Sequence, residues 1–190
     1  ILNAVIDNSS YDNAIQFDCA LVTSAELLGS DESQHVYRAT KQGKGVAVAI
    51  ETTTPDGYSG KIHLVVGVTS SETGSAKVTG VRILEHKETP GLGDKIDLRI
   101  SDWVLDFDNQ TYSADIATNW AVKKDGGQFD QFTGATITPR AVVSAVKLSA
   151  EYYLANQAAI FNAANACAVN NSADAIVENA VAKKVSQSNE

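Results

Sequence analysis

The chain has 190 residues, of which 44% are hydrophobic, and it carries a formal net charge of −8 at pH 7. This length supports one globular domain with its own core. Lys and Arg residues are scattered, so the composition disfavours a nucleic-acid-binding protein, and the acidic balance disfavours adsorption to anionic lipid. The longest apolar runs, residues 46–50 and 64–68, are far shorter than the ~20 residues that a membrane helix needs. We therefore expect a soluble domain.

The chain begins with Ile and contains no Met. This leads us to expect a fragment whose natural N-terminus has been removed. Its two cysteines, Cys19 and Cys167, lie near opposite ends, and its three histidines show no ligand spacing, so no zinc or iron–sulfur site is expected. From the residues alone, the cysteines are either buried free thiols or, in an oxidising compartment, one disulfide.

The first predicted elements are one or two short helices within Asn3–Leu28, where apolar residues recur at roughly helical spacing. From residue 35 the apolar period becomes two, which predicts four strands joined by short turns. A tight turn is expected at Gly43, and another in the Thr-Pro-Asp-Gly sequence at residues 54–57. The four predicted strands are His35–Gln42, Lys44–Thr54, Lys61–Thr69 and Ala76–His86.

Helical spacing returns over Lys95–Phe107, for which Asp94 is the expected N-cap. One further short strand is predicted over Trp120–Lys124. A long helix is then expected to begin near Thr138, with Thr138 as its N-cap and Pro139 at its first helical position. Apolar residues recur every three or four positions after it, which predicts one packed face.

These elements predict an α+β fold, a single domain in which a mostly antiparallel sheet is flanked by helices and followed by a long C-terminal helix. We expect an N-terminal helical segment over residues 1–33, the main domain over residues 34–164 and a weakly patterned C-terminal tail over residues 165–190.

Two loops have the composition of ligand-binding segments. Residues 88–93 read Glu-Thr-Pro-Gly-Leu-Gly, where glycines on either side of Leu92 let the backbone approach a ligand closely. Residues 130–136 read Asp-Gln-Phe-Thr-Gly-Ala-Thr and lead into the long helix, whose first N–H groups and macrodipole favour a phosphate. Taken singly, each loop is better explained by an ordinary turn or helix entry.

Taken together, the two loops resemble the FMN-binding domain family, and within it the G subunit of Rnf-type electron-transport complexes. The segments 57–62, Gly-Tyr-Ser-Gly-Lys-Ile, and 120–127, Trp-Ala-Val-Lys-Lys-Asp-Gly-Gly, match as well. The resemblance covers residues 57–147 and identifies residues 34–164 as an FMN-binding domain. In this family a flavin transferase moves FMN from FAD onto the last Thr of the second loop, which is Thr136 here.

The resemblance implies where the flavin lies. Thr136 carries FMN through a phosphoester, while Thr133, Gly134 and Ala135 line the phosphate. Either Lys123 or Lys124 pairs with the flavin oxygens. The isoalloxazine ring is covered by Glu88, Thr89, Leu92 and Gly93. No residue is expected to act as a catalytic acid, base or nucleophile, since the sequence offers no such set.

The function that the resemblance implies is electron transfer by a redox subunit of a membrane-bound, ion-translocating oxidoreductase. The expected partners are the other subunits of that complex and, during maturation, the flavin transferase. The domain would lie on the periplasmic side of the bacterial inner membrane, held by an N-terminal anchor missing from this chain. In that oxidising setting, we expect Cys19 and Cys167 to form a disulfide.

Three other functions compete with this one. The related C subunit of sodium-translocating NADH:quinone oxidoreductases shares both loops. A free-standing flavoenzyme would use such a domain to deliver electrons to a reductase domain, for which this chain is too short. A binding module without redox chemistry would use the helix start for another phosphate.

Overall fold

The computed structural model describes residues 1–169. Six strands form one antiparallel sheet in the order β1-β2-β3-β4-β5-β6, so each strand pairs with its neighbour in the chain. This confirms the predicted α+β class, with its antiparallel sheet and long C-terminal helix. The strands are β1 Cys19–Ser24, β2 Ser30–Lys41, β3 Lys44–Gly57, β4 Gly60–Ser70, β5 Ser75–Glu85 and β6 Gln110–Ser113.

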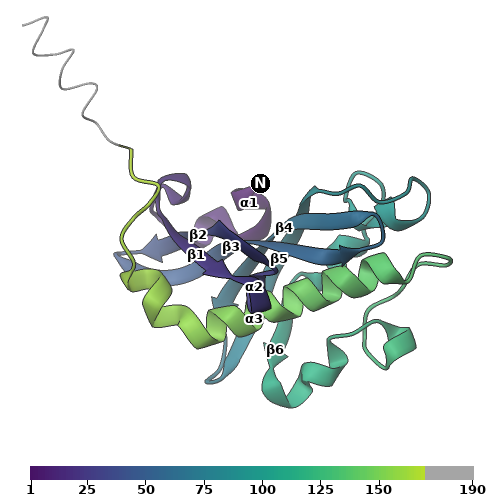
Figure 1. Ribbon diagram of the computed structural model, residues 1–190. Coiled ribbons are helices and arrows are strands. Elements are labelled where there is room, and N and C mark those ends of the chain that lie inside the picture. The colour runs from purple at the N-terminus through teal and green to yellow at the C-terminus, as the bar shows by residue number, and fades with distance from the viewer. Residues whose placement is uncertain (170–190) are drawn as a thin grey trace, which may run out of the picture.

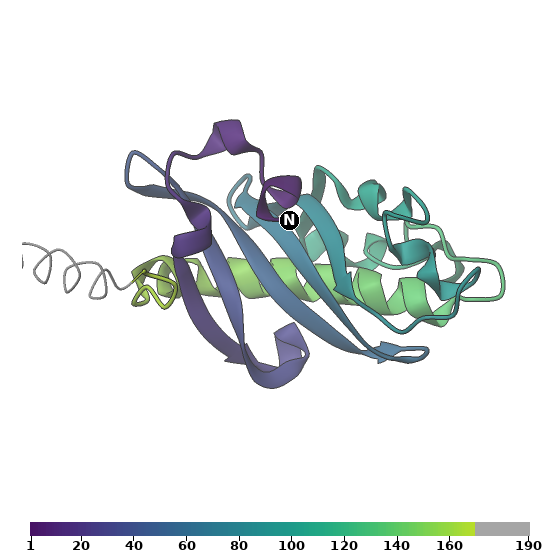
Figure 2. The same cartoon turned by 90° about the horizontal axis from the view of Figure 1, so that it is seen from above.

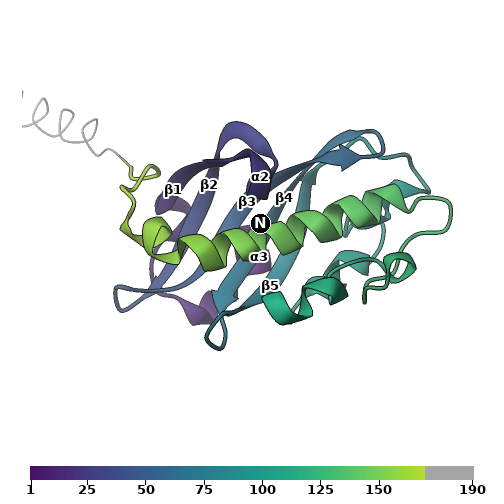
Figure 3. The same ribbon diagram turned by 60° about the horizontal axis from the view of Figure 1, so that its bottom comes forward.

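The sheet lies between two layers of unequal size. Helix α3, Ile137–Asn162, runs across one face, and the N-terminal segment with α1, Leu2–Val5, lies on the other (Figure 1). Figures 2 and 3 show the same arrangement from above and from the α3 side. Because side chains alternate along a strand, Val48 and Ile50 face α3 while Ala47 and Ala49 face the N-terminal segment.

The α3 layer contains most of the core. Val142 and Val146 of α3 pack with strand residues and with an aromatic group from the loops that follow β5. The rings of Phe107 and Phe129 in this group stack with centroids 4.5 Å apart, and Trp103 meets Phe107 edge-on at 5.3 Å. Burial of such rings stabilises the loops that lead to the second motif.

The C-terminal end of α3 is held by a buried side chain from the sheet. Arg38 of β2 donates to the carbonyl oxygens of Ile160 and Ala163, at 3.1 and 2.7 Å, and its Nε donates to Asp18 at 2.7 Å. Carbonyl groups at a helix end lack intrahelical partners, and a guanidinium there also complements the macrodipole.

Several local expectations were wrong. The stretch up to Leu28 does contain two short helices, α1 and α2, Ala25–Leu28, but it also contains the strand β1, which was not predicted. The predicted turn at residues 54–57 belongs to β3, whose pairing shifts there before the chain reverses at residues 58–59. Instead of the predicted strand over Trp120–Lys124, the structure has one 3₁₀ turn, Lys123–Asp125.

The predicted helix over Lys95–Phe107 is also wrong. Two 3₁₀ turns occupy this stretch, Gly93–Ile96 and Trp103–Phe107, and Asp94 lies inside the first without capping it. Of the tail predicted over residues 165–190, the part from residue 170 lies outside the described residues. Within residues 1–169, no helix combines the length and the apolar character needed to span a membrane.

A disulfide joins Cys19 to Cys167, 148 residues apart, with Cα atoms 5.3 Å from each other. The structure thus pairs the two cysteines as expected for an oxidising compartment. The bond ties the segment after α3 to the edge strand β1 and closes a loop of almost the whole domain.

We predict that replacing both cysteines by Ser lowers the free energy of unfolding by up to about 4–5 kcal/mol, because the denatured chain regains the freedom that the long loop had removed. Urea unfolding of wild type and the double variant, both without reductant, measures the difference. Free thiols in unfolded, unreduced wild type would contradict the pairing.

Candidate functional site

A pocket of about 380 Å³ opens where three distant segments meet. These are the turn between β3 and β4, the loop after β5 and the start of α3. The structure therefore brings the two motif loops together, with seven of the ten predicted site residues on one cavity. The pocket is lined by Tyr58, Glu88, Thr89, Leu92, Gly93, Gly134, Ala135, Thr136, Ile137 and Thr138.

Glu88 connects the three segments at the buried side of the pocket. Its side chain is only 5% exposed, and its carboxylate accepts hydrogen bonds from the backbone N–H groups of Tyr58 at 3.2 Å and Ser59 at 2.9 Å. The hydroxyl of Thr138 donates a third, short hydrogen bond. Three donors satisfy a buried carboxylate that would otherwise be costly to desolvate. Glu88 therefore fixes the hairpin turn relative to the start of α3.

Gly93 permits this close approach. A β-carbon at Gly93 would lie 2.6 Å from the Thr138 hydroxyl and 3.0 Å from a carboxylate oxygen of Glu88. No side chain fits between the loop and the helix start without pushing them apart. The sequence predicted that this glycine lets the backbone approach a ligand. In the structure it lets the loop pack closely on α3.

The start of α3 presents donors to the pocket. Gly134 has φ of +75°, which carries the chain into the helix at a conformation that favours glycine. Among the described residues, the N–H groups of Ile137 and Thr138 have no hydrogen-bond acceptor. Unpaired N–H groups and the macrodipole make this end attractive to an anion.

Thr136, not Thr138, occupies the N-cap position of α3. The predicted N-cap was wrong because Thr138 is already the second helical residue and its hydroxyl is bound to Glu88. Pro139 is accordingly the third helical residue, still within the turn where a missing N–H is harmless. The Thr136 side chain makes no capping hydrogen bond and is half-buried in the pocket wall. Of the two hydroxyls, that of Thr136 is available for chemistry.

Three apolar side chains stand at the mouth of the pocket. Tyr58 is 71% exposed, Ile137 46% and Leu92 43%. Leu92 lies next to the second loop, since a β-carbon at Gly134 would be 3.9 Å from Leu92 Cδ2. Sequence reasoning missed Tyr58 and Ile137 as site residues. The only signal for Tyr58 was its place in a matching segment, and none marked Ile137.

The remaining predicted site residues do not line the pocket. The exposed Thr133 precedes the segment that does. Lys123 Nζ pairs with Asp130 Oδ1 at 2.6 Å, and this hydrogen bond raises the pKa of Lys123. The backbone N–H of Lys124 donates to Gln131 at 3.1 Å. Both lysines therefore brace residues 130–131 of the second motif.

An ion pair beside the helix start braces the same region. Arg140 Nε lies 2.6 Å from Asp125 Oδ2, and the hydrogen bond from Arg140 lowers the pKa of Asp125. Both groups are exposed, so the pair contributes little stability. It joins the turn after Val122 to the first turn of α3.

The lining residues suit a ligand with an anionic part and an apolar part. They include no His, Cys or Lys, and the one carboxylate, Glu88, is already hydrogen-bonded on both oxygens. The pocket thus offers an anion site at the helix start, the Thr136 hydroxyl beside that site, and an apolar mouth, and its lining residues contain no acid–base pair.

Comparison with known proteins identifies the family to which the residues of this pocket belong. Residues 57–151, which contain the whole pocket lining, match the model of the FMN-binding domain family. The G subunit of the ion-translocating oxidoreductase complex of Pseudoalteromonas atlantica is 66% identical over 163 residues, 86% of this chain and 74% of that protein. The chain belongs to the FMN-binding domain family and to the family of these G subunits. The corresponding G subunit of Vibrio cholerae El Tor is 53% identical over 162 residues, 85% of this chain and 75% of that protein.

Among solved structures, the crystal structure of Shewanella oneidensis NqrC matches 80% of this chain and 73% of its own, with a TM-score of 0.49 and 17% sequence identity.

We predict that Thr138→Val lowers the free energy of unfolding by about 1–3 kcal/mol, because it removes one of the three donors from the buried Glu88 carboxylate without changing the side-chain shape. Thr138→Ser retains the hydroxyl and is the matched control. Urea unfolding of the cofactor-free protein measures both. A Val variant as stable as wild type would contradict the hydrogen bond's role.

Proposed function

We propose that the protein is an electron-transfer subunit that carries FMN covalently on Thr136, within a membrane-bound complex that couples electron transfer to ion translocation. The observation that carries this proposal is the Thr136 hydroxyl, which is free of capping bonds and lies in the pocket at the positive end of α3. The family match supplies the cofactor class.

The residues of the pocket fit FMN part by part. The N–H groups of Ile137 and Thr138 would hold the phosphate, and Gly134 and Ala135 leave room beside them. Thr89, Leu92 and Gly93 line the wall where the ring would be covered, and Tyr58 and Ile137 extend the apolar surface at the mouth. Glu88 holds these parts in place from the buried side.

Attachment requires one exchange at phosphorus. The Thr136 hydroxyl would lose its proton and bond to the flavin-side phosphorus of FAD, and AMP would leave as the pyrophosphate bond breaks. A flavin transferase would catalyse this step, because the pocket lining has no base for it. When bound, FMN supplies one- and two-electron transfer, and the protein tunes it by apolar cover, hydrogen bonds and charge.

The setting of the complex is part of the proposal. The domain would face the periplasm at the bacterial inner membrane, anchored by a segment outside this chain. The relatives named as G subunits favour this role over that of a C-type subunit of a sodium-translocating NADH:quinone oxidoreductase or an electron-delivery module of a free-standing flavoenzyme. Contact of Lys123 or Lys124 with flavin oxygens stays a prediction.

We expect Thr136→Ala to abolish covalent flavin while the domain still unfolds cooperatively, because the hydroxyl and methyl groups that it removes belong to a half-buried side chain that makes no capping hydrogen bond. After co-expression with the transferase, the intact mass of wild type should exceed the mass of the unmodified chain by FMN less one water. The wild-type band should also show flavin fluorescence on a denaturing gel, and the Thr136→Ala band should not. Thr133→Ala is the control for recognition and should slow modification without abolishing it. Covalent flavin that persists in Thr136→Ala would move the attachment site.

We expect Leu92→Ala to retain covalent flavin but to expose the ring, because Leu92 is an apolar side chain between two glycines at the pocket mouth. Flavin fluorescence and the redox midpoint potential should both shift as water replaces apolar cover. Leu98→Ala is a matched control, since Leu98 is similarly exposed at 41% but does not line the pocket. An absorbance spectrum and midpoint equal to wild type would show that Leu92 does not contact the ring.

A further inference from the structure

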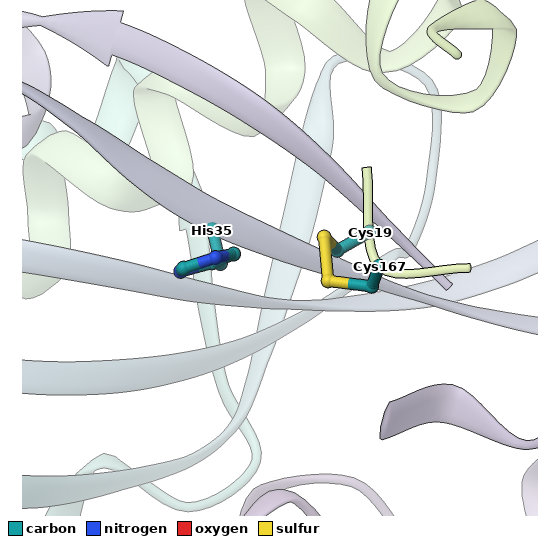
Figure 4. A group of neighbouring side chains, drawn as sticks. All are labelled: Cys19, His35 and Cys167. Carbon is teal, nitrogen blue, oxygen red and sulfur yellow. A yellow bond between two sulfur atoms is a disulfide. The ribbon is translucent and has the colours of Figure 1, made fainter. Parts of the chain in front are cut away.

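The disulfide lies beside a histidine at the β1 edge of the sheet. Cys19 is on β1, His35 on β2 and Cys167 in the segment that follows α3. One ligand atom from each, the two Sγ atoms and a ring nitrogen, lie within 4.8 Å of one another (Figure 4). Spacing along the chain gave no sign of this cluster, because its members come from three separate segments.

The two sulfur atoms would stay close together without their covalent bond. The side-chain oxygen of Asn165 accepts from the backbone N–H of Cys19 at 3.1 Å and from that of Cys167 at 2.9 Å. The N–H of Ala166 donates to the carbonyl of Cys19 at 2.9 Å, and Asn165 donates to the carbonyl of Phe17 at 2.8 Å. Three of these hydrogen bonds join the segment to Phe17 and Cys19, the fourth lies within the segment, and none of them requires the bond between the two sulfur atoms.

A carboxylate and an aromatic ring hold the His35 ring in place beside the two sulfur atoms. Its Nδ1 lies 2.9 Å from Glu51 Oε2, and its ring stacks on Tyr37 with centroids 5.6 Å apart. Glu51 is on β3, on the other side of β2 from the strand of Cys19. A neutral His35 that donates from Nδ1 to Glu51 keeps a lone pair on Nε2. Carboxylates that orient a ligating histidine in this way are the usual second layer of zinc sites.

We propose that reduction of the disulfide creates a binding site for a divalent cation of zinc's class, with Cys19, Cys167 and His35 as ligands. A dithiol reductant supplies two electrons and two protons, the S–S bond breaks, and the reductant leaves as a cyclic disulfide. Metal binding then releases both thiol protons. Two thiolates and one imidazole suit Zn²⁺ in tetrahedral geometry, with water in the fourth position. The disulfide and the bound metal are thus two alternative ways to hold the segment after α3 against β1. Neither of them depends on FMN.

The test uses the full chain, reduced by an excess of a dithiol that is then removed without oxygen. Zn²⁺ is titrated in competition with a chromophoric chelator, and Co²⁺ serves as a second probe, for which thiolate charge-transfer bands and tetrahedral d–d bands report the ligands. We expect one Zn²⁺ per reduced chain and no such binding by the oxidised chain. The affinity should rise with pH, because thiolates are the ligands.

Variants identify the ligands. His35→Gln is well suited because its side chain is 41% exposed, so the replacement should fold. His35→Gln should lose the tight binding, and Glu51→Gln should weaken binding by about 10–100-fold. Cys19→Ser, which leaves one thiolate, should lose tight binding and weaken the thiolate bands, and the Cys19→Ser/Cys167→Ser double variant should abolish those bands. His63→Gln is the matched control, since His63 bonds to Thr53 elsewhere on the same face. Binding by the oxidised chain at equal strength, or equal affinity of His35→Gln and wild type, would overturn the proposal.

Discussion

A buried carboxylate is stable only when donors replace the water it loses, and Glu88 obtains its donors from two other parts of the chain. The hairpin turn supplies two N–H groups and α3 supplies the Thr138 hydroxyl. Any arrangement that separated these segments would leave a buried charge unsatisfied. The pocket exists because the loop of Glu88 cannot move without that penalty, and Gly93 lets the loop lie close enough for the third bond to form.

A charged side chain also fixes the other end of α3. At its C-terminus, Arg38 binds the last carbonyl groups and the segment that follows is tied to β1 by hydrogen bonds and the disulfide. Between these ends lie 26 residues, or about 39 Å of helix. Each end is thus fixed by a charged side chain from outside the helix. Damage to the disulfide end should therefore lower stability while leaving the pocket geometry intact.

The local sequence pattern predicted most of the sheet. It failed where contacts with residues far away in the sequence determine the local structure. Alternation along β2 to β5 identified those strands, because one face of each packs on α3. The short β1 and β6 were missed, since four to six residues carry too little pattern. Lys95–Phe107 has helical spacing, yet Asp97 binds the N–H of Arg99 and Ser101 binds that of Trp103, which divides it into 3₁₀ turns.

The site shows the same limit. The two motif loops were found by their composition, and their meeting at one pocket follows from the fold. Thr138 is a residue type that favours the N-cap, but its hydroxyl donates to the carboxylate of Glu88, 50 residues earlier in the chain. The helix begins at Ile137 instead. No local rule includes such a partner. Tyr58 and Ile137 were missed for a related reason, because an apolar side chain reveals a site only when the structure leaves it exposed beside a cavity.

The charge of the protein gives a physical reason for the covalent attachment proposed above. A net charge of −8 repels an anion at long range, and an open pocket with an exposed mouth offers only local attraction from two N–H groups and a helix end. A free phosphate monoester carries nearly two negative charges at neutral pH, whereas a diester on Thr136 would carry one. A bond to Thr136, as proposed, would thus lower the repulsion and remove any dependence on reversible affinity. The pocket would then have only to orient the ring, and its apolar mouth could stay open toward the electron-exchange partner.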